Sequence, residues 1–278
     1  MVNKSTKEYK LIALDLDGVL LKSDMKVLPN TVKIIKKIHK RGVKIIIVTG
    51  KSLFSAKKYA NLLGIRDLMI CNHGAIIGDP VKNKLLFEIR LPRYALKAIG
   101  LMLNTYPELQ CYFTSDNKAF MVENPLIPVK EQYHEKNGFK LEKQYPLNYK
   151  FEKLLKKVPS KIIFYTPIGK EKKYILALKK YFKNKVNVYR SKPGNVELSP
   201  LTVSKGKALS IICRKWKIKP QEAIAVGDEE NDISMLKFAG LGVAINNAVP
   251  QLKRHADYIT SRSNENGGVE EAIKKFIL

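Results

Sequence analysis

Short apolar segments alternate with amphipathic ones at both ends of the chain. The segments "LIALDLD" (residues 11–17) and "VKIIIVTG" (43–50) have the composition of buried strands. Between them, "TVKIIKKIHKRG" (31–42) places its apolar residues at helical spacing and ends at a glycine. After residue 204 the alternation returns, with strands expected in "AIAVGD", "GLGVAI" and "DYIT". This pattern predicts an α/β fold with a Rossmann-like parallel sheet and helices on both faces.

The middle of the chain has a different pattern, because its predicted strands come in pairs. The segment "LQCYFTSDNKAFMVEN" (109–124) is typical of a hairpin with its turn near Asp116, and a lysine-rich helix is expected over residues 170–182. We therefore expect a core domain made of residues 1–80 and 200–278, with an inserted α+β domain at 81–199. Ligands of open parallel sheets bind at the carboxyl edge, so the inserted domain is expected to lie over that edge.

Polar residues interrupt the strand pattern at the carboxyl ends of the predicted strands. Asp15 and Asp17 end the first strand, and Asp228 follows "AIAVG", with Asp232 in the next turn. These ends converge in a parallel sheet, so the four acids are expected to form a cluster. Clustered carboxylates repel one another, and a divalent cation relieves that repulsion. An all-oxygen ligand set favours Mg²⁺ over Zn²⁺.

A second group of residues has the features of a phosphate site. Thr49 and Gly50 end a strand just before a predicted helix, where a hydroxyl and backbone N–H groups are available to an anion. Lys205 lies in the first turn of another predicted helix, where its charge opposes the helix dipole unless an anion is near. A cation site, a phosphate cradle and a free carboxylate together indicate phosphoryl transfer.

The composition argues against a membrane-spanning or secreted protein. Of the 278 residues, 45% are hydrophobic, and no apolar run approaches the roughly 20 residues of a membrane span. The polar start "MVNKSTKEYK" lacks the apolar segment of a signal peptide, so a cytoplasmic protein without a membrane partner is expected. The cysteines Cys71, Cys111 and Cys213 are far apart in apolar stretches and are expected to be small core residues.

The charge is strongly positive, with 51 Lys and Arg against 25 Asp and Glu and a net charge of +26. Such a charge attracts polyanions and also favours small phosphorylated substrates. The lysines are spread along the whole chain, without an Arg-rich tail or a recognisable nucleic-acid-binding motif. We therefore rank nucleic acid below a small phosphorylated metabolite as the partner.

Four motifs in order make the chain similar to a known superfamily. They are "DLDGVLL" (15–21), "VTGKS" (48–52), "SKGKAL" (204–209) and "GDEENDISML" (227–236), followed by "NENGGV" near the end. The chain resembles the haloacid dehalogenase (HAD) superfamily, specifically the Cof-type phosphatases with a large inserted cap. The resemblance implies the HAD fold, with the cap as the substrate-specificity domain. The cap is also the region where the motif match is weakest.

The resemblance also implies roles for the acids. Asp15 attacks phosphorus and forms an aspartyl-phosphate. Asp17 protonates the leaving oxygen and then deprotonates the hydrolytic water. Mg²⁺ is held by the Asp15 carboxylate, the Asp17 backbone carbonyl and Asp228, and Asp232 supports the metal through its waters or through Lys205.

Other positions complete the implied site. Thr49, Gly50, Lys205 and Asn231 bind the phosphoryl group, and Gly18 lets the chain turn tightly away from it. One departure is visible: the family often has Asn-Gly-Ala after the third core strand, whereas this chain has "NHGA". His73 stands at the usual asparagine position, either as a substrate contact or as a packing residue in the turn.

The prediction is a Mg²⁺-dependent phosphatase of a small phosphorylated metabolite, a sugar phosphate or a phosphorylated cofactor, acting as a monomer or homodimer. Two alternatives stay open. One is a phosphomutase or phosphotransferase that uses the same nucleophile and returns the phosphate to an organic acceptor. The other is a nucleic-acid-binding protein with a secondary HAD site, which the charge motivates.

Overall fold

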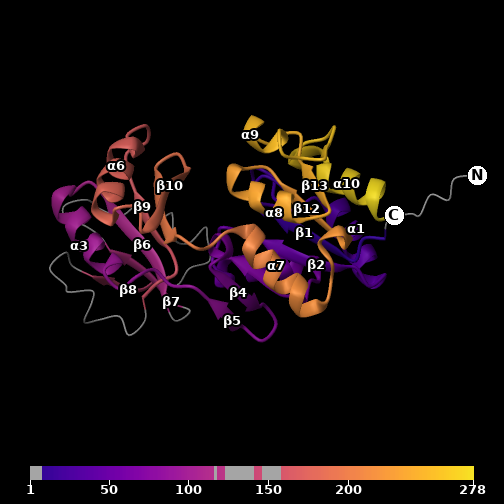
Figure 1. Cartoon of the computed structure of the whole chain (residues 1–278), viewed down its shortest axis with the longest axis horizontal. Helices are drawn as coiled ribbons and strands as arrows, with labels where there is room; N and C mark the ends of the chain where they lie inside the picture. Colours follow the sequence, from indigo (N-terminus) through magenta and orange to yellow (C-terminus); the bar gives the residue numbers. More distant parts are fainter. Residues whose placement is uncertain (1–7, 116–117, 123–140, 146–157) are drawn as a thin grey trace, which may run out of the picture. The chain divides into compact units, whose positions relative to one another are not determined.

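The computed structural model describes residues 8–115, 118–122, 141–145 and 158–278 (Figure 1). The chain divides into two compact units. The first unit combines Met1–Phe87 with Ser204–Leu278, and the second is Glu88–Val203. Each unit has its own sheet and its own hydrophobic core. The second unit is thus inserted between the two segments of the first.

The first unit is built on an eight-stranded sheet in the order β14-β13-β12-β1-β2-β3-β4-β5. The pairs from β14 to β3 are parallel, and β4 runs antiparallel to β3. The strands are β1 Leu11–Asp15, β2 Lys44–Val48, β3 Met69–Cys71, β4 Ile76–Asp79, β5 Lys84–Glu88, β12 Ala223–Gly227, β13 Leu241–Ala244 and β14 Tyr258–Ile259. The parallel core that the apolar pattern predicted is confirmed.

Helices cover both faces of this sheet, as predicted. On one face lie α1 (Pro29–Lys40), α2 (Leu53–Leu63) and α10 (Gly268–Phe276). On the other lie α7 (Lys205–Trp216), α8 (Ile233–Phe238) and α9 (Pro250–Lys253). Because side chains alternate along a strand, the apolar residues of β1 before Asp15 can serve both cores.

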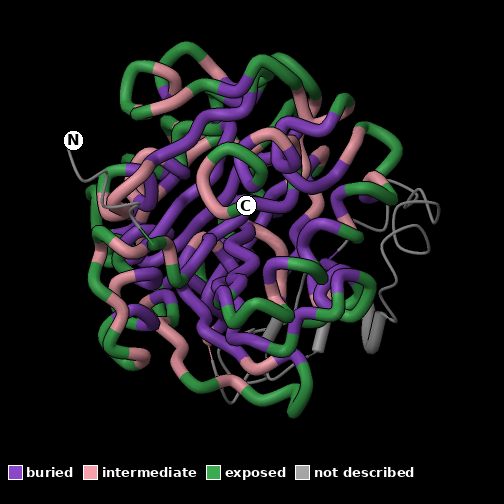
Figure 2. The backbone as a smooth tube through the Cα atoms, turned by 90° about the vertical axis from the view of Figure 1, so that its right-hand side faces the viewer, coloured by how far each residue is buried: buried purple, intermediate pink, exposed green. Residues whose placement is uncertain are grey.

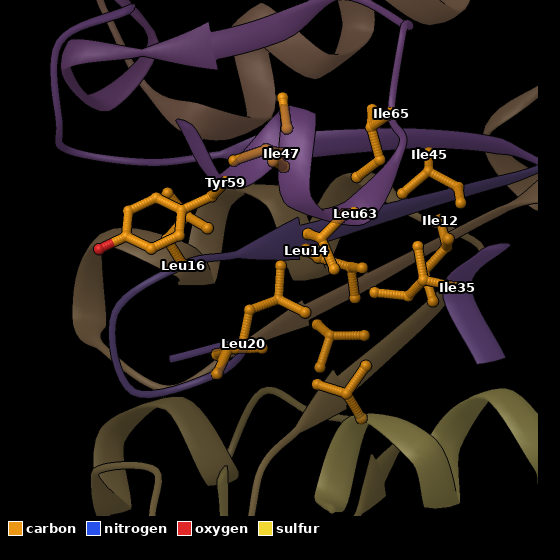
Figure 3. Packing of buried hydrophobic residues seen from close by; sticks show 14 of the residues in the cluster. Ile12, Leu14, Leu16, Leu20, Ile35, Ile45, Ile47, Tyr59, Leu63 and Ile65 are labelled. Atoms are coloured by element: carbon orange, nitrogen blue, oxygen red, sulfur yellow. The ribbon is translucent and has the colours of Figure 1, made fainter. Parts of the chain in front are cut away.

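The β1 strand shows this division directly. Ile12 and Leu14 pack with α1 and α2, and Leu11 and Ala13 pack with α7. Figure 3 shows Ile12 and Leu14 among Ile35, Tyr59 and Leu63, on the α1–α2 side. Buried stretches of the backbone lie mostly in the interior, and exposed stretches lie mostly toward the outside (Figure 2). The strand is therefore fixed from both sides up to the residue where its apolar run ends.

The second unit is an α+β structure on a six-stranded sheet in the order β10-β11-β9-β6-β7-β8. Helices α3 (Ala95–Thr105) and α6 (Glu171–Phe182) share one core with this sheet. The strands are β6 Gln110–Ser115, β7 Lys118–Val122, β8 Leu141–Tyr145, β9 Ile162–Tyr165, β10 Val186–Lys192 and β11 Asn195–Pro200.

The predicted hairpin and lysine-rich helix of this unit are both present. Strands β6 and β7 pair antiparallel with Ser115 opposite Lys118, and the turn near Asp116 lies outside the described residues. The helix predicted at 170–182 is α6. Helix α3 was not expected from the sequence, where only paired strands and one helix were foreseen.

The three cysteines lie where their apolar surroundings in the sequence predicted. Cys71, Cys111 and Cys213 are all buried and form no disulfide with one another, as expected of small core residues. Among the described residues, no helix has both the length and the apolar character needed to cross a membrane.

Candidate active site

The end of β1 delivers Asp15 to the carboxyl edge of the sheet, where its side chain is buried. The chain then turns at once, because the backbone N–H groups of Leu20 and Leu21 both donate to the Leu16 carbonyl, at 3.1 and 2.8 Å. Gly18 within this turn has a φ of +75°, and a Cβ atom there would collide with the Asp228 carboxylate. The glycine therefore allows the loop after β1 to approach the loop after β12.

Three carboxylates from two segments, the end of β1 and the loop after β12, meet at this edge. Asp15, Asp228 and Asp232 each offer an oxygen, and these oxygens lie within 4.8 Å of one another. Strands β1 and β12 are parallel neighbours with Leu14 opposite Val226, so their last residues reach the same point. Asp232 is fixed because its Oδ2 accepts the backbone N–H groups of Asp228 and Glu229, at 3.0 and 3.1 Å.

Lys205 joins this cluster from the start of α7. Ser204 caps the helix by accepting the Lys207 N–H, and Lys205 follows as the first helical residue, 2% exposed. Its Nζ lies 2.9 Å from Oδ1 of Asp15 and 2.5 Å from Oδ1 of Asp232. The negative charge that the sequence predicts near Lys205 is thus provided by the Asp15 and Asp232 carboxylates.

The cluster has more negative than positive charge, since one lysine faces three carboxylates. Burial, with Lys205 opposing it, raises the pKa of Asp15 to about 7. Burial and the neighbouring Asp15 and Asp232 raise the pKa of Asp228 to about 9. Burial alone would lower the pKa of Lys205, but the same two acids outweigh it and raise that pKa. The site is short of positive charge.

These residues fit a magnesium ion. Oδ1 of Asp228 is buried and has no hydrogen-bond partner among the described residues, so it is an acceptor oxygen with nothing to compensate its burial. It belongs to an all-oxygen cluster with an excess of negative charge, which is the donor set that Mg²⁺ prefers. A divalent cation would supply both the missing charge and the missing partner.

The carboxylate of Asp17 does not join the three clustered acids, contrary to the expectation that all four would meet. It is half-exposed, and its Oδ1 forms an ion pair with Nζ of Lys51 at 2.9 Å. Lys51 was not singled out from the sequence, although it lies inside the "VTGKS" motif. Of the four predicted acids, Asp15 and Asp232 therefore pair with Lys205, and Asp17 pairs with Lys51.

The end of β2 and the turn after β3 bring the remaining predicted residues together. Thr49 is fully buried, and its Oγ1 accepts the Lys51 N–H at 3.0 Å, which leaves the hydroxyl hydrogen for another acceptor. The ring of His73 occupies the space that a side chain on Gly50 would need. Nδ1 of His73 also lies 3.2 Å from Nδ2 of Asn231. His73 thus packs on Gly50 and meets Asn231.

Comparison with known proteins places this geometry in a family. A sequence model of the haloacid dehalogenase-like hydrolases matches residues 12–273. A 5-amino-6-(5-phospho-D-ribitylamino)uracil phosphatase of Bacillus subtilis is 29% identical over 277 residues, which span 100% of this chain and 99% of the relative. An HMP-PP phosphatase of Serratia proteamaculans is 28% identical, over 88% of this chain and 86% of the relative.

Comparison with solved structures indicates the same family as the sequence comparisons. The crystal structure of a haloacid dehalogenase-like hydrolase from Bacteroides thetaiotaomicron matches with a TM-score of 0.84 at 28% identity, covering 96% of this chain and 99% of that one. The expected fold, a parallel core with an inserted α+β unit, is confirmed. The chain belongs to the haloacid dehalogenase superfamily, among its Cof-type phosphatases, and is a phosphoric monoester hydrolase.

Proposed function

We propose that this chain is a Mg²⁺-dependent phosphatase that hydrolyses a small phosphorylated metabolite through an aspartyl-phosphate on Asp15. The observation that carries the proposal is the cluster of Asp15, Asp228 and Asp232 around Lys205 at the carboxyl edge of the sheet. A nucleophilic carboxylate, a site for a cation and a fixed ammonium group are the components that phosphoryl transfer needs.

In the first step an Asp15 oxygen forms a bond to phosphorus as the bond from phosphorus to the leaving oxygen breaks. Asp17 gives its proton to that oxygen, so the product leaves as a neutral alcohol and Asp17 becomes a carboxylate. In the second step Asp17 takes a proton from water as the water oxygen attacks phosphorus. Asp15 is released as a carboxylate, with inorganic phosphate as the second product.

The other residues bind and orient. Bound Mg²⁺ supplies positive charge that offsets the repulsion between the Asp15 carboxylate and the anionic phosphoryl group. The Asp15 and Asp228 carboxylates and the Asp17 backbone carbonyl would hold it. Asp232 supports the site through its contact with Lys205.

Four residues are proposed to hold the phosphoryl oxygens: Thr49, Gly50, Lys205 and Asn231. The hydroxyl hydrogen of Thr49 supports this role, because the Thr49 oxygen already accepts a backbone N–H and its hydrogen can be donated. His73 packs against Gly50 and Asn231, so a substrate contact from His73 would fall beside the phosphoryl group rather than on a remote part of the ligand.

The second unit, Glu88–Val203, is proposed to select the substrate. Its chain re-enters the first unit at Ser204, the cap of α7 and the residue just before Lys205. The relatives described above are named as phosphatases of phosphorylated metabolites. A sugar phosphate or a phosphorylated cofactor is the class of substrate we propose.

The test is phosphate release from a panel of phosphorylated metabolites and from p-nitrophenyl phosphate, with and without Mg²⁺. Asp15→Asn should abolish turnover while the protein stays folded. Asp24→Asn is the matched control, because Asp24 is an exposed acid that pairs with Lys22 in the first unit. Full activity in a folded Asp15→Asn variant would refute the assignment of the nucleophile. A rearranged product with little free phosphate would assign a phosphomutase instead.

A further inference from the structure

Lys51 has a backbone that is fixed by three neighbouring segments. Its N–H donates to Oγ1 of Thr49 at 3.0 Å, and its carbonyl accepts the N–H of Asn72 at 3.0 Å. The next residue, Ser52, is the cap of α2, and its hydroxyl accepts the Ser55 N–H. The end of β2, the turn after β3 and the start of α2 therefore hold the base of this side chain in one place.

From this base the side chain reaches Asp17, with 2.9 Å between Nζ and Oδ1. The Lys51 side chain is only 22% exposed, against 53% for Lys10, whose ion pair with Glu222 lies on the surface. A long, mobile lysine that is mostly covered and anchored at its base has lost much of its rotamer freedom already. Such a pair fixes the direction of the carboxylate better than an ordinary surface pair does.

The charges around Asp17 explain why a partner is needed there. Asp15, Asp228 and Asp232 lie together with Lys205 as their ammonium partner. A fourth carboxylate turned into that group would add to the repulsion, and Asp17 instead turns to Lys51. The carboxylate is then half-exposed, outside the acidic cluster, where a leaving alcohol could be met and released.

We propose that Lys51 is a positioning residue for Asp17 and sets the direction from which the leaving oxygen is protonated. This inference rests on the proposed function, because it assigns a role within the same two steps. When Asp17 has given its proton to the leaving oxygen it is a carboxylate, and Lys51 holds it in the place from which it next takes a proton from water. Lys51 itself gains and loses no proton.

The alternative role for Lys51 is a direct contact with the phosphoryl group, and leaving-group dependence separates the two. An alkyl phosphate releases a strongly basic oxygen that needs the proton, whereas p-nitrophenolate leaves with little help. The constant kcat/KM reports the steps up to the first release of product, so it is independent of the later hydrolysis. A positioning role predicts unequal losses on the two substrates, and a phosphate contact predicts equal losses.

The experiment measures kcat/KM for p-nitrophenyl phosphate and for an alkyl phosphate that the wild-type enzyme accepts, with saturating Mg²⁺. Lys51→Met should lower the alkyl value by at least about tenfold, as part of the roughly 10²–10⁴ that a general acid contributes. The aryl value should fall by less than about threefold. Lys51→Arg should recover most of the alkyl activity, because it restores the ion pair with Asp17.

Lys10→Met is the matched control, since it removes an equal charge and an exposed ion pair of the first unit. It should change neither constant. Lys51→Gln serves as a second variant if Lys51→Met melts at a lower temperature than the wild type. Equal losses on both substrates, or no loss on either, would overturn the inference. Failure of the proposed function would give a different result. A folded Asp15→Asn variant would then still release phosphate as the wild-type enzyme does.

Discussion

Replacing Lys205 by methionine tests how the cluster of buried acids is stabilised. Lys205 is 2% exposed and lies 2.9 Å from an Asp15 oxygen, with Asp232 on its other side. Methionine fills most of the space of the lysine but leaves Asp15, Asp228 and Asp232 without their ammonium partner. In the metal-free protein, the substitution should therefore strongly lower the free energy of unfolding.

The magnitude follows from two opposing effects. At an effective dielectric constant of about 20, unit charges separated by the Lys205–Asp15 distance attract by about 6 kcal/mol. Burial of the ammonium group offsets much of this gain. Removing one partner of a buried ion pair costs about 3–5 kcal/mol, because the remaining charge is left uncompensated. We expect a loss in this range at pH 8.

The measurement is urea denaturation of the wild-type and Lys205→Met proteins after removal of metal, at pH 8 and at pH 6. Without Lys205 the pKa of Asp15 rises further above about 7, so between pH 8 and pH 7 Asp15 of the variant binds more proton than Asp15 of the wild type. The loss of stability should therefore be smaller at pH 6 than at pH 8. Lys215→Met, on an exposed position of the same helix, should change stability by less than about 0.5 kcal/mol. A loss below about 1 kcal/mol at pH 8 would refute the reasoning.

Three further predictions follow from the same unit. Gly18→Ala should lower the free energy of unfolding by at least about 1–2 kcal/mol, because alanine is strained at the positive φ of this position. The added Cβ should also displace the Asp228 carboxylate and weaken Mg²⁺ binding. Thermal melts with and without Mg²⁺ measure both effects, and unchanged melts would contradict the prediction. The folded-state pKa values of Asp15 and Asp228, about 7 and about 9, lie above the unfolded value of about 3.9, so the metal-free protein should lose stability as pH rises from about 4 to 9. Saturating Mg²⁺ should flatten that dependence in urea titrations at pH 5, 7 and 9, and an equally steep slope with the ion would count against a cation site. Ile35 is fully buried between α1 and the sheet, so Ile35→Ala should lower the free energy of unfolding by about 2–5 kcal/mol, as measured by urea denaturation. A loss below about 1 kcal/mol would show that this core relaxes around the cavity.

The meeting of Asp15 with Asp228 was predictable from sequence for a physical reason. Apolar residues of buried parallel strands are easy to recognise, and parallel neighbours end at one edge of the sheet. A charged residue directly after an apolar strand segment can therefore be assigned to the carboxyl edge of the sheet from the sequence alone. The same reasoning located Thr49 and Lys205, which also stand where an element ends or begins.

Sequence patterns could not give contacts that depend on side-chain direction. Asp17 was expected among the other acids because it was placed at the end of the first strand, but β1 ends at Asp15 and the turn carries Asp17 toward Lys51. The contact between His73 and Asn231 joins two turns whose backbone conformations are set locally, with φ of +57° at His73. Neither contact leaves a periodic trace in the sequence.

Helix α3 was missed for a different reason. Gly100 lies in its middle, and glycine costs about 1 kcal/mol in a helix relative to alanine. Its buried residues include the neighbours Ala95 and Leu96 and the neighbours Ala98 and Ile99, so the apolar positions spread beyond a narrow stripe. Burial on a wide face weakens the helical period in the sequence, and tertiary packing supplies the stability that the local sequence lacks.

The place of β1 in the sheet has a consequence for the order in which a ribosome makes the protein. Leu11 pairs with Lys44 on one side and with Ala223 on the other. While the second unit is being synthesised, β1 has its β2 neighbour but not yet β12, so one edge of a strand that is apolar up to Asp15 has no partner from this chain. Such an edge is prone to aggregation. A nascent chain released before β12 would thus carry the second unit while the apolar edge of β1 is still open, and its need for chaperones should be greatest in that interval of translation.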